Sequence, residues 1–157
     1  MAEPRKLTPA EEARLAQVRE QFKQKQAISN SLNSIKYRIG VYSGKGGVGK
    51  TTVTTNLALM LAKSGKKVAI LDCDIDCPNV TRVLKISNRP EADNEGKMIP
   101  PEKYGVSVMS MGFFQENEDE AIVWRGPMIH NAINQFISKT NWGNICLLYT
   151  SPSPRDS

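Results

Sequence analysis

A glycine-rich run at residues 44–51 is the feature that most restricts what this chain can fold into. It has the sequence GKGGVGKT and fits the pattern G-x-x-x-x-G-K-[ST]. A β-rich run at residues 35–42 precedes it, and residues 50–63 follow with apolar positions at helical spacing. The apolar run at residues 68–72 then predicts a buried strand. This order of strand, loop, helix and strand predicts a βαβ unit with a right-handed crossover and a parallel sheet.

Each part of the glycine-rich run has a chemical reason to bind phosphate. Glycines let successive backbone N–H groups turn toward phosphate oxygens, and the helix that follows directs the positive end of its dipole at the same anion. We expect Lys50 to contact the β- and γ-phosphates, Thr51 to ligate Mg²⁺ and Thr52 to contact the α-phosphate. The alternative is a glycine-rich turn without a ligand. The predicted nucleotide-binding residues are Gly44, Lys45, Gly46, Gly47, Val48, Gly49, Lys50, Thr51 and Thr52.

A polar helix is predicted from Thr8 to about Ser34. Thr8 suits the N-cap, Pro9 suits the first helical position and Glu11 completes a capping box. The apolar positions of this helix are few, and they are Leu15, Val18, Phe22, Ile28 and Leu32. We therefore expect residues 1–34 to form a helical extension that lies on the surface of the main domain. A partner-binding arm is the alternative.

The main domain is predicted to span residues 35–145 and to belong to the α/β class. Residues 88–103, rich in Pro, Glu, Asp and Asn, predict an exposed excursion, and residues 106–111 predict a third strand. Pro127 lies near the first position of another helix. The apolar residues of that helix have the spacing of a core face, and they are Met128, Ile129, Ala132, Ile133, Phe136 and Ile137.

Several segments together resemble one family. The run SGKGGVGKTT, followed by LDCDID at the end of the next strand, resembles the deviant Walker-A ATPases related to MinD and ParA. The segments YGVSVMSMGFF, VWRGPMIHNAINQFI and NWGNI resemble the Mrp branch, which includes iron–sulfur cluster carriers such as bacterial ApbC. The resemblance covers residues 35–145. It implies a P-loop NTPase fold, a mostly parallel sheet flanked by helices, and a Mg²⁺-dependent ATPase that carries iron–sulfur clusters as a homodimer.

The resemblance also assigns roles to single residues. Lys45 resembles the signature lysine that reaches across a nucleotide-sandwich dimer to the partner's phosphates, and Lys50 keeps its P-loop role. Asp74 matches the switch-I aspartate that positions the attacking water or a metal-bound water; its structural alternative is a carboxylate that caps the next turn. Lys45, Lys50 and Asp74 are therefore the predicted catalytic residues. Residues 124–127 match the WRGP segment of the branch.

The chain departs from the Mrp pattern between residues 72 and 79. The common form there is DADIYGPS, and this chain has DCDIDCPN. Cys73 and Cys77 alone are two ligands short of a closed tetrahedral metal site, so we expect Cys73 to be buried structure. The downstream C-x-x-C, which holds a [4Fe–4S] cluster between two subunits in this family, does not occur in the sequence. We therefore expect the cluster only in a full-length parent protein.

Residues 146–157 differ in kind from the rest. Their sequence, CLLYTSPSPRDS, resembles translated sequencing-adapter read-through, and it begins where the family has an apolar strand and a segment resembling DLPPGTGD. We predict a non-native tail on an N-terminal fragment that has an incomplete sheet and no ATPase activity of its own. A genuine short strand with a disordered Ser/Pro tail is the alternative.

Composition restricts the partners and the setting. The net charge is +5 with the basic residues scattered, so we expect neither a nucleic-acid nor a membrane partner. Three cysteines and no apolar N-terminal segment favour a reducing, cytoplasmic setting. The expected partners are ATP, a second copy of the chain and iron–sulfur apoproteins that receive the cluster. His130 is predicted to be a surface residue, and Met109 and Met111 to be core residues.

Two other functions remain open at this stage. One is a MinD- or ParA-like positioning ATPase, which would need a C-terminal amphipathic helix for a membrane or a basic face for DNA. The other is a fragment without enzymatic activity that binds nucleotide weakly or does not fold.

Overall fold

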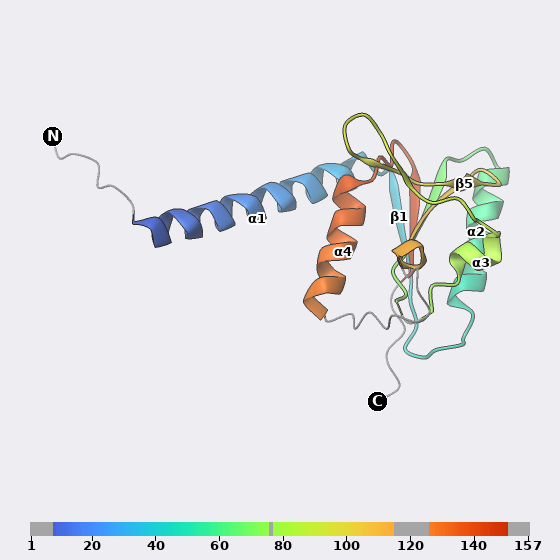
Figure 1. Ribbon diagram of the computed structural model, residues 1–157. Coiled ribbons are helices and arrows are strands. Elements are labelled where there is room, and N and C mark those ends of the chain that lie inside the picture. Colours follow the sequence, from blue (N-terminus) through green and yellow to red (C-terminus); the bar gives the residue numbers. More distant parts are fainter. Residues whose placement is uncertain (1–7, 76, 115–125, 151–157) are drawn as a thin grey trace.

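The fold is built around a five-stranded sheet with helices on both faces (Figure 1). The computed structural model describes residues 8–75, 77–114 and 126–150. The helical elements are α1 (Pro9–Ser34), α2 (Lys50–Lys63), α3 (Val80–Leu84), the 3₁₀ turn η1 (Met111–Phe114) and α4 (Gly126–Lys139). The strands are β1 (Tyr37–Val41), β2 (Val68–Asp72), β3 (Glu91–Ala92), β4 (Met98–Ile99), β5 (Glu102–Lys103), β6 (Val106–Ser110) and β7 (Cys146–Thr150).

The main sheet has the strand order β1–β7–β2–β6–β5. Its first four strands are parallel, and β5 is antiparallel to β6. The last residue of β2, Asp72, is in register with Ser110 of β6 and with Thr150 of β7, and Thr150 is in register with Val41 of β1. The carboxyl ends of four strands therefore meet at one edge of the sheet, which is where ligands bind in open α/β sheets.

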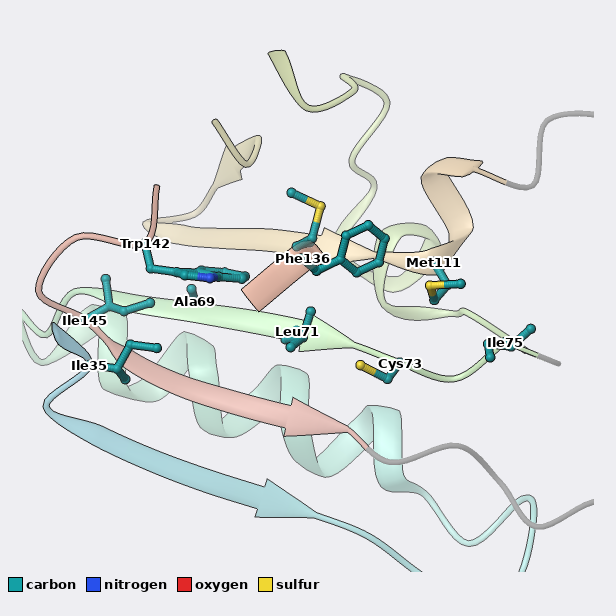
Figure 2. Packing of buried hydrophobic residues seen from close by; sticks show 10 residues of the cluster. Ile35, Ala69, Leu71, Cys73, Ile75, Met111, Phe136, Trp142 and Ile145 are labelled. Atoms are coloured by element: carbon teal, nitrogen blue, oxygen red, sulfur yellow. The ribbon is translucent and has the colours of Figure 1, made fainter. Parts of the chain in front are cut away.

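Strand β2 is the centre of the core, because all five of its residues are buried. Val68 and Ile70 belong to the cluster that packs under α2 and α3, and Ala69 and Leu71 belong to the cluster under α4. Figure 2 shows the second cluster, in which the side chains of β2 face Phe136 and Trp142. Successive side chains of a strand point to opposite faces, so an apolar run buried on both faces explains the predicted parallel sheet.

The predicted βαβ unit is confirmed, as are the third strand and the helix that follows it. The helix at residues 50–63 ends with Gly65 at a φ of +81°, in the left-handed region that suits a residue after a helix. Met109 and Met111 are fully buried, and His130 is exposed, as expected. Met128 is the exception on the predicted core face of α4, because it is 47% exposed.

The predicted excursion at residues 88–103 is largely exposed and contains the antiparallel pair β3–β4 and the strand β5. The acidic residues 116–120 and two members of the WRGP segment, Trp124 and Arg125, lie outside the described residues. No helix in the described part of the chain is long and apolar enough to cross a membrane.

The helix α1 is confirmed with both bonds of its capping box. Thr8 N–H donates to the carboxylate of Glu11 at 2.8 Å, and Glu11 N–H donates back to Thr8 Oγ1 at 3.4 Å. Its expected placement on the domain surface is wrong for most of its length, because α1 projects away from the body (Figure 1) and none of its residues is buried. Only its last turns contribute to packing, through Leu32.

Strand β7 occupies the centre of the sheet, between β1 and β2. It lies where the Mrp resemblance expects an apolar strand after NWG, and its backbone pairs in parallel on both sides. The origin of residues 146–157 stays a prediction, and residues 151–157 lie outside the described chain.

Candidate functional site

The glycine-rich loop connects β1 to α2 at the carboxyl edge of the sheet. Two of its glycines have left-handed backbone conformations, with φ of +70° at Gly47 and +94° at Gly49. Side chains at these positions would be strained, so only these two glycines are required by the observed backbone. Gly49 is the N-cap of α2 and provides no side-chain cap. The helix thus begins with its positive dipole end directed at the loop.

The lysine that follows the loop, Lys50, is held in a defined position. It is the first residue of α2 and is only 8% exposed. Its ammonium donates to Ser43 Oγ at 3.5 Å, and Ser43 Oγ donates to the carbonyl of Lys45 at 2.7 Å. Ser43 therefore links Lys45, near the start of the loop, to the Lys50 ammonium at its end.

The first turns of α2 are fixed from within by two threonines. Thr54 Oγ1 donates to the carbonyl of Lys50 at 2.9 Å, and Thr55 Oγ1 donates to the carbonyl of Thr51 at 2.8 Å. Both threonines are buried, whereas Thr51 is half-buried and Thr52 is exposed. The two hydroxyls predicted to contact Mg²⁺ and phosphate therefore lie on the accessible first turn of a helix that deeper side chains support.

Two aspartates lie at the carboxyl end of β2, at the same edge of the sheet: Asp72 is the last residue of the strand, and Asp74 comes two residues later. Asp72 is buried and accepts from Asp74 N–H at 3.2 Å, from Val80 N–H at 3.4 Å and from Ser110 Oγ at 3.2 Å. It joins the end of β2 to β6 and to the start of α3. Asp74 is 7% exposed, and its Oδ1 accepts from Cys77 N–H at 3.1 Å. This bond is the contact that the structural interpretation of Asp74 predicts.

The two nearby cysteines have different environments. Cys73 is completely buried, and burial, with a smaller contribution from the charge of Asp72, raises the pKa of its thiol to about 12. Cys77 is exposed. A metal ligand must be a thiolate, so the environment of Cys73 disfavours metal binding. The described residues contain no group of three or more His, Cys, Asp or Glu side chains that could hold a metal ion.

The structure brings the predicted loop residues together at the edge where β1, β7, β2 and β6 end, with the side chain of Lys45 exposed. Sequence reasoning missed Ser43, Asp72 and Ser110. Ser43 directly precedes the first glycine, and Asp72 is an acid at the end of a buried strand, so position could have suggested both. Ser110 offered no signal, because its role depends on the pairing of β2 with β6.

Comparison with known proteins identifies the family. Residues 34–154 match the family described as ParA: NUBPL iron-transfer P-loop NTPase. The chain belongs to this family. The site at the carboxyl edge of its sheet is therefore a P-loop in sequence context as well as in geometry.

The relatives of this chain are named for the transport or assembly of iron–sulfur clusters. An iron–sulfur cluster carrier protein of Methanococcus maripaludis is 43% identical over 128 residues, covering 81% of this chain and 44% of that protein. Its counterpart in Bacillus subtilis is 49% identical over 107 residues, covering 68% of this chain and 30% of that protein. The cytosolic Fe-S cluster assembly factor NUBP2 of Mus musculus is 40% identical, covering 83% of this chain and 49% of that protein. The chain thus spans less than half the length of these relatives.

A solved structure supports the same fold. A nucleotide-binding protein from Archaeoglobus fulgidus, described in complex with ADP, superimposes with a TM-score of 0.68 at 33% identity. The match covers 81% of this chain and 49% of that protein. The described residues therefore share their α/β P-loop fold with this nucleotide-binding protein.

Proposed function

We propose that this chain provides the nucleotide-binding part of an ATP-dependent iron–sulfur cluster carrier of the Mrp type. The observation that carries the proposal is the buried Lys50, held at the N-terminus of α2 by Ser43. The names of relatives that are 40–49% identical support the same cargo.

The described residues fit Mg·ATP. Lys50 supplies a fixed positive charge for the β- and γ-phosphates, and the first turn of α2 supplies a dipole and N–H groups for the same anion. Thr51 is the residue that would hold Mg²⁺, which neutralises phosphate charge when it is bound. Phosphoryl transfer needs mainly positioning and charge neutralisation, so a preformed loop with a fixed lysine suits it.

Two further roles belong to the same proposal. The exposed Lys45 extends from the loop toward the phosphates of a second subunit, which makes ATP turnover depend on a homodimer. Asp74, buried at the end of β2, orients the attacking water or a metal-bound water. Its bond to Cys77 N–H gives the carboxylate a fixed orientation, which a positioning role requires.

The cargo and the setting are also proposed. The iron–sulfur cluster is carried as a substrate and passed to apoproteins, with its ligands outside the described residues of this chain. The mouse relative is named as cytosolic, and we propose a cytoplasmic setting for this protein as well.

Calorimetric titration of the chain with Mg·ATP tests the nucleotide part of the proposal. We expect saturable binding that Lys50→Ala reduces by about 10- to 150-fold, because a charged contact to phosphate contributes roughly 1.5–3 kcal/mol and the remaining site is left without its fixed cation. Lys63→Ala is the matched control, since Lys63 lies in the last turn of the same helix and is exposed. Equal affinities for Lys50→Ala and the parent would overturn the proposal.

A further inference from the structure

The main sheet has a second edge, opposite the glycine-rich loop, where its four parallel strands begin. The segments that lead into β1, β7 and β2 are held together there by backbone hydrogen bonds. Lys36 N–H donates to the carbonyl of Ile145 at 3.1 Å, and Cys146 N–H donates to the carbonyl of Lys67 at 2.9 Å. Three segments that lie far apart in the sequence are therefore fixed side by side at this edge.

Two cavities that share lining residues form a groove along this edge, and we call them together the amino-edge groove. The first has a volume of about 300 Å³, and the residues that line it include Lys36, Tyr37, Lys66 and Lys67. The second has a volume of about 510 Å³, shares Lys66 and Lys67 with the first, and extends to Ser107 of β6. The groove therefore crosses the beginnings of β1, β7, β2 and β6. Adjacent strands are about 4.8 Å apart, so this distance is about 15 Å.

The charge of the groove is positive. Lys36, Lys66 and Lys67 are all exposed, and none of the described residues that line the first cavity is acidic. Glu102 is the one acidic residue among the described residues that line the second cavity. Basic residues that are scattered along the sequence thus converge in the fold, which removes the reason for expecting no nucleic-acid partner.

An exposed tyrosine lies at each end of the groove. Tyr37, the first residue of β1, lines the first cavity and is 60% exposed, and the Lys36 ammonium lies 5.5 Å from the centre of its ring. Tyr104 directly precedes Gly105, which lines the second cavity. Tyr104 is 63% exposed, and the Lys103 ammonium lies 5.5 Å from the centre of its ring. Each end of the groove therefore presents an aromatic ring beside a cation.

The backbone of Tyr104 is unfavourable for a tyrosine. Its φ is +55°, in the left-handed region, where a bulky side chain is strained. Tyr104 and Gly105 form the turn between β5 and β6, and turns that need a positive φ prefer glycine, asparagine or aspartate. The ring of Tyr104 is exposed, so core packing does not compensate for this strain. Strained residues are concentrated where proteins hold ligands, which points to a binding role for this ring.

We propose that the amino-edge groove binds single-stranded nucleic acid, with its lysines on the phosphates and its two tyrosine rings on unpaired bases. A positively charged groove with aromatic side chains on which bases stack is the general form of such sites. Its length of about 15 Å spans roughly four phosphates at a spacing of about 3.4 Å along one strand. A protein partner fits less well, because lysine is depleted from protein–protein interfaces.

Fluorescence anisotropy of the full chain with a labelled oligothymidylate of about 12 nucleotides tests the proposal. We expect saturable binding in the absence of ATP and Mg²⁺. With three phosphate contacts, the logarithm of the affinity should fall with the logarithm of the salt concentration at a slope of about −2. Added Mg·ATP should displace no more oligonucleotide than the same concentration of MgCl₂ does. Specific displacement by ATP would place the oligonucleotide on the glycine-rich loop and would contradict the proposal.

Charge reversal in the groove has a matched control elsewhere in the chain. Lys66→Glu with Lys67→Glu should weaken binding at least about ten-fold, since two charged contacts to phosphate are lost. Lys23→Glu with Lys25→Glu changes the net charge equally on the exposed, projecting part of α1, and it should weaken binding less than about two-fold because salt screens distant charges. Equal losses for the two double variants would show only a general attraction to net charge, and the proposal would be wrong.

Tyr104→Gly separates binding from folding. Glycine adopts a positive φ without strain, so the midpoint of urea unfolding should be no lower than that of the parent chain. The same change removes a stacking ring and should weaken binding about five-fold or more. Tyr37→Ala should also weaken binding, and Tyr37→Phe should restore it because the ring is kept. Full affinity in both Tyr104→Gly and Tyr37→Ala, equal affinity for the annealed duplex, or equally tight binding of poly-glutamate would each overturn the proposal.

Discussion

Lys50 and Ser43 are joined by a hydrogen bond across the glycine-rich loop, with 3.5 Å between the ammonium nitrogen and Ser43 Oγ. The same hydroxyl donates to the carbonyl of Lys45 at 2.7 Å, so one side chain contacts both the Lys50 ammonium and the backbone of the loop. Ser43, the residue directly before the loop, therefore helps to hold the Lys50 charge in place. This arrangement lowers the ordering cost that a phosphate ligand would otherwise meet on binding.

Ser43→Ala tests whether this preorganisation matters. We expect the dissociation constant for Mg·ATP to rise about two- to ten-fold, because a neutral hydrogen bond contributes roughly 0.5–1.5 kcal/mol. The effect should be much smaller than that of Lys50→Ala, which removes the charge itself. Calorimetry measures both. If Ser43→Ala and Lys50→Ala weakened binding equally, the lysine would act only through the position that Ser43 gives it.

Lys45 and Asp74 should affect turnover more than binding. Lys45→Ala is expected to lower the ATPase rate of a complete carrier at least about 100-fold and to leave binding to one subunit nearly unchanged. Asp74→Asn should behave in the same direction. The test is a chimera in which residues 1–145 precede the remainder of a carrier relative, with phosphate release and nucleotide affinity measured on the same samples. Equal losses of affinity and rate would indicate ordinary ground-state contacts instead.

Local signals were sufficient to predict most of the fold. The residues of β2 alternate between two apolar faces, and its neighbours in sequence carry loop and helix signals, so the βαβ unit followed from the chain alone. The capping box at Thr8 was equally local, and its two hydrogen bonds are confirmed. The placement of α1 depended on something that the sequence does not contain, namely whether the body offers a surface for Leu15, Val18 and Phe22.

The site was predictable to the extent that it is contiguous. Residues 44–52 form one motif, whose geometry follows from the glycines and the helix after them. The contacts of Asp72 were not predictable, because they join residues that are 2, 8 and 38 positions away. The last of these, to Ser110, exists only because β2 and β6 are neighbours in register.

Asp72 should be a determinant of stability at the carboxyl edge of the sheet. The buried carboxylate of Asp72 accepts hydrogen bonds from three donors. Asp72→Asn replaces one of its two acceptor oxygens with an NH₂ group, which can only donate. We expect the free energy of unfolding to fall by about 1–3 kcal/mol, the usual cost of leaving buried polar groups unsatisfied. Urea unfolding followed by circular dichroism measures the change.

Ser110→Ala is the matched control for this prediction. It removes one of the donors to Asp72 and leaves the carboxylate in place, so we expect a loss of about 1 kcal/mol. A loss for Ser110→Ala as large as that for Asp72→Asn would mean that the link between β2 and β6 alone carries the stabilisation.

The three thiols should react with Ellman's reagent in a fixed order. Cys77 is exposed, Cys146 is half-buried and Cys73 is fully buried. Burial also raises the thiol pKa values of Cys146 and Cys73, and the thiolate is the reactive form. At pH 8 we therefore expect Cys77 to react first, Cys146 more slowly and Cys73 only after urea unfolding. Cys77→Ser should remove the fast phase alone, and a fast phase that survived this change would contradict the assignment.

The raised pKa of Cys73 also predicts how stability depends on pH. The folded chain keeps the Cys73 proton up to a pKa of about 12, whereas the ordinary value is 9.0. Between these values the unfolded state binds fewer protons than the folded state, so the free energy of unfolding decreases as pH rises. The contribution of the protonated Cys73 thiol to the free energy of unfolding is therefore fully present below about pH 9, and it is lost progressively toward pH 12. Cys73→Ala should lower stability at neutral pH by opening a cavity, but it should flatten the decrease above pH 9. Urea unfolding at pH 7.5 and at pH 10 measures both effects, and an unchanged alkaline slope in Cys73→Ala would show that another group is responsible.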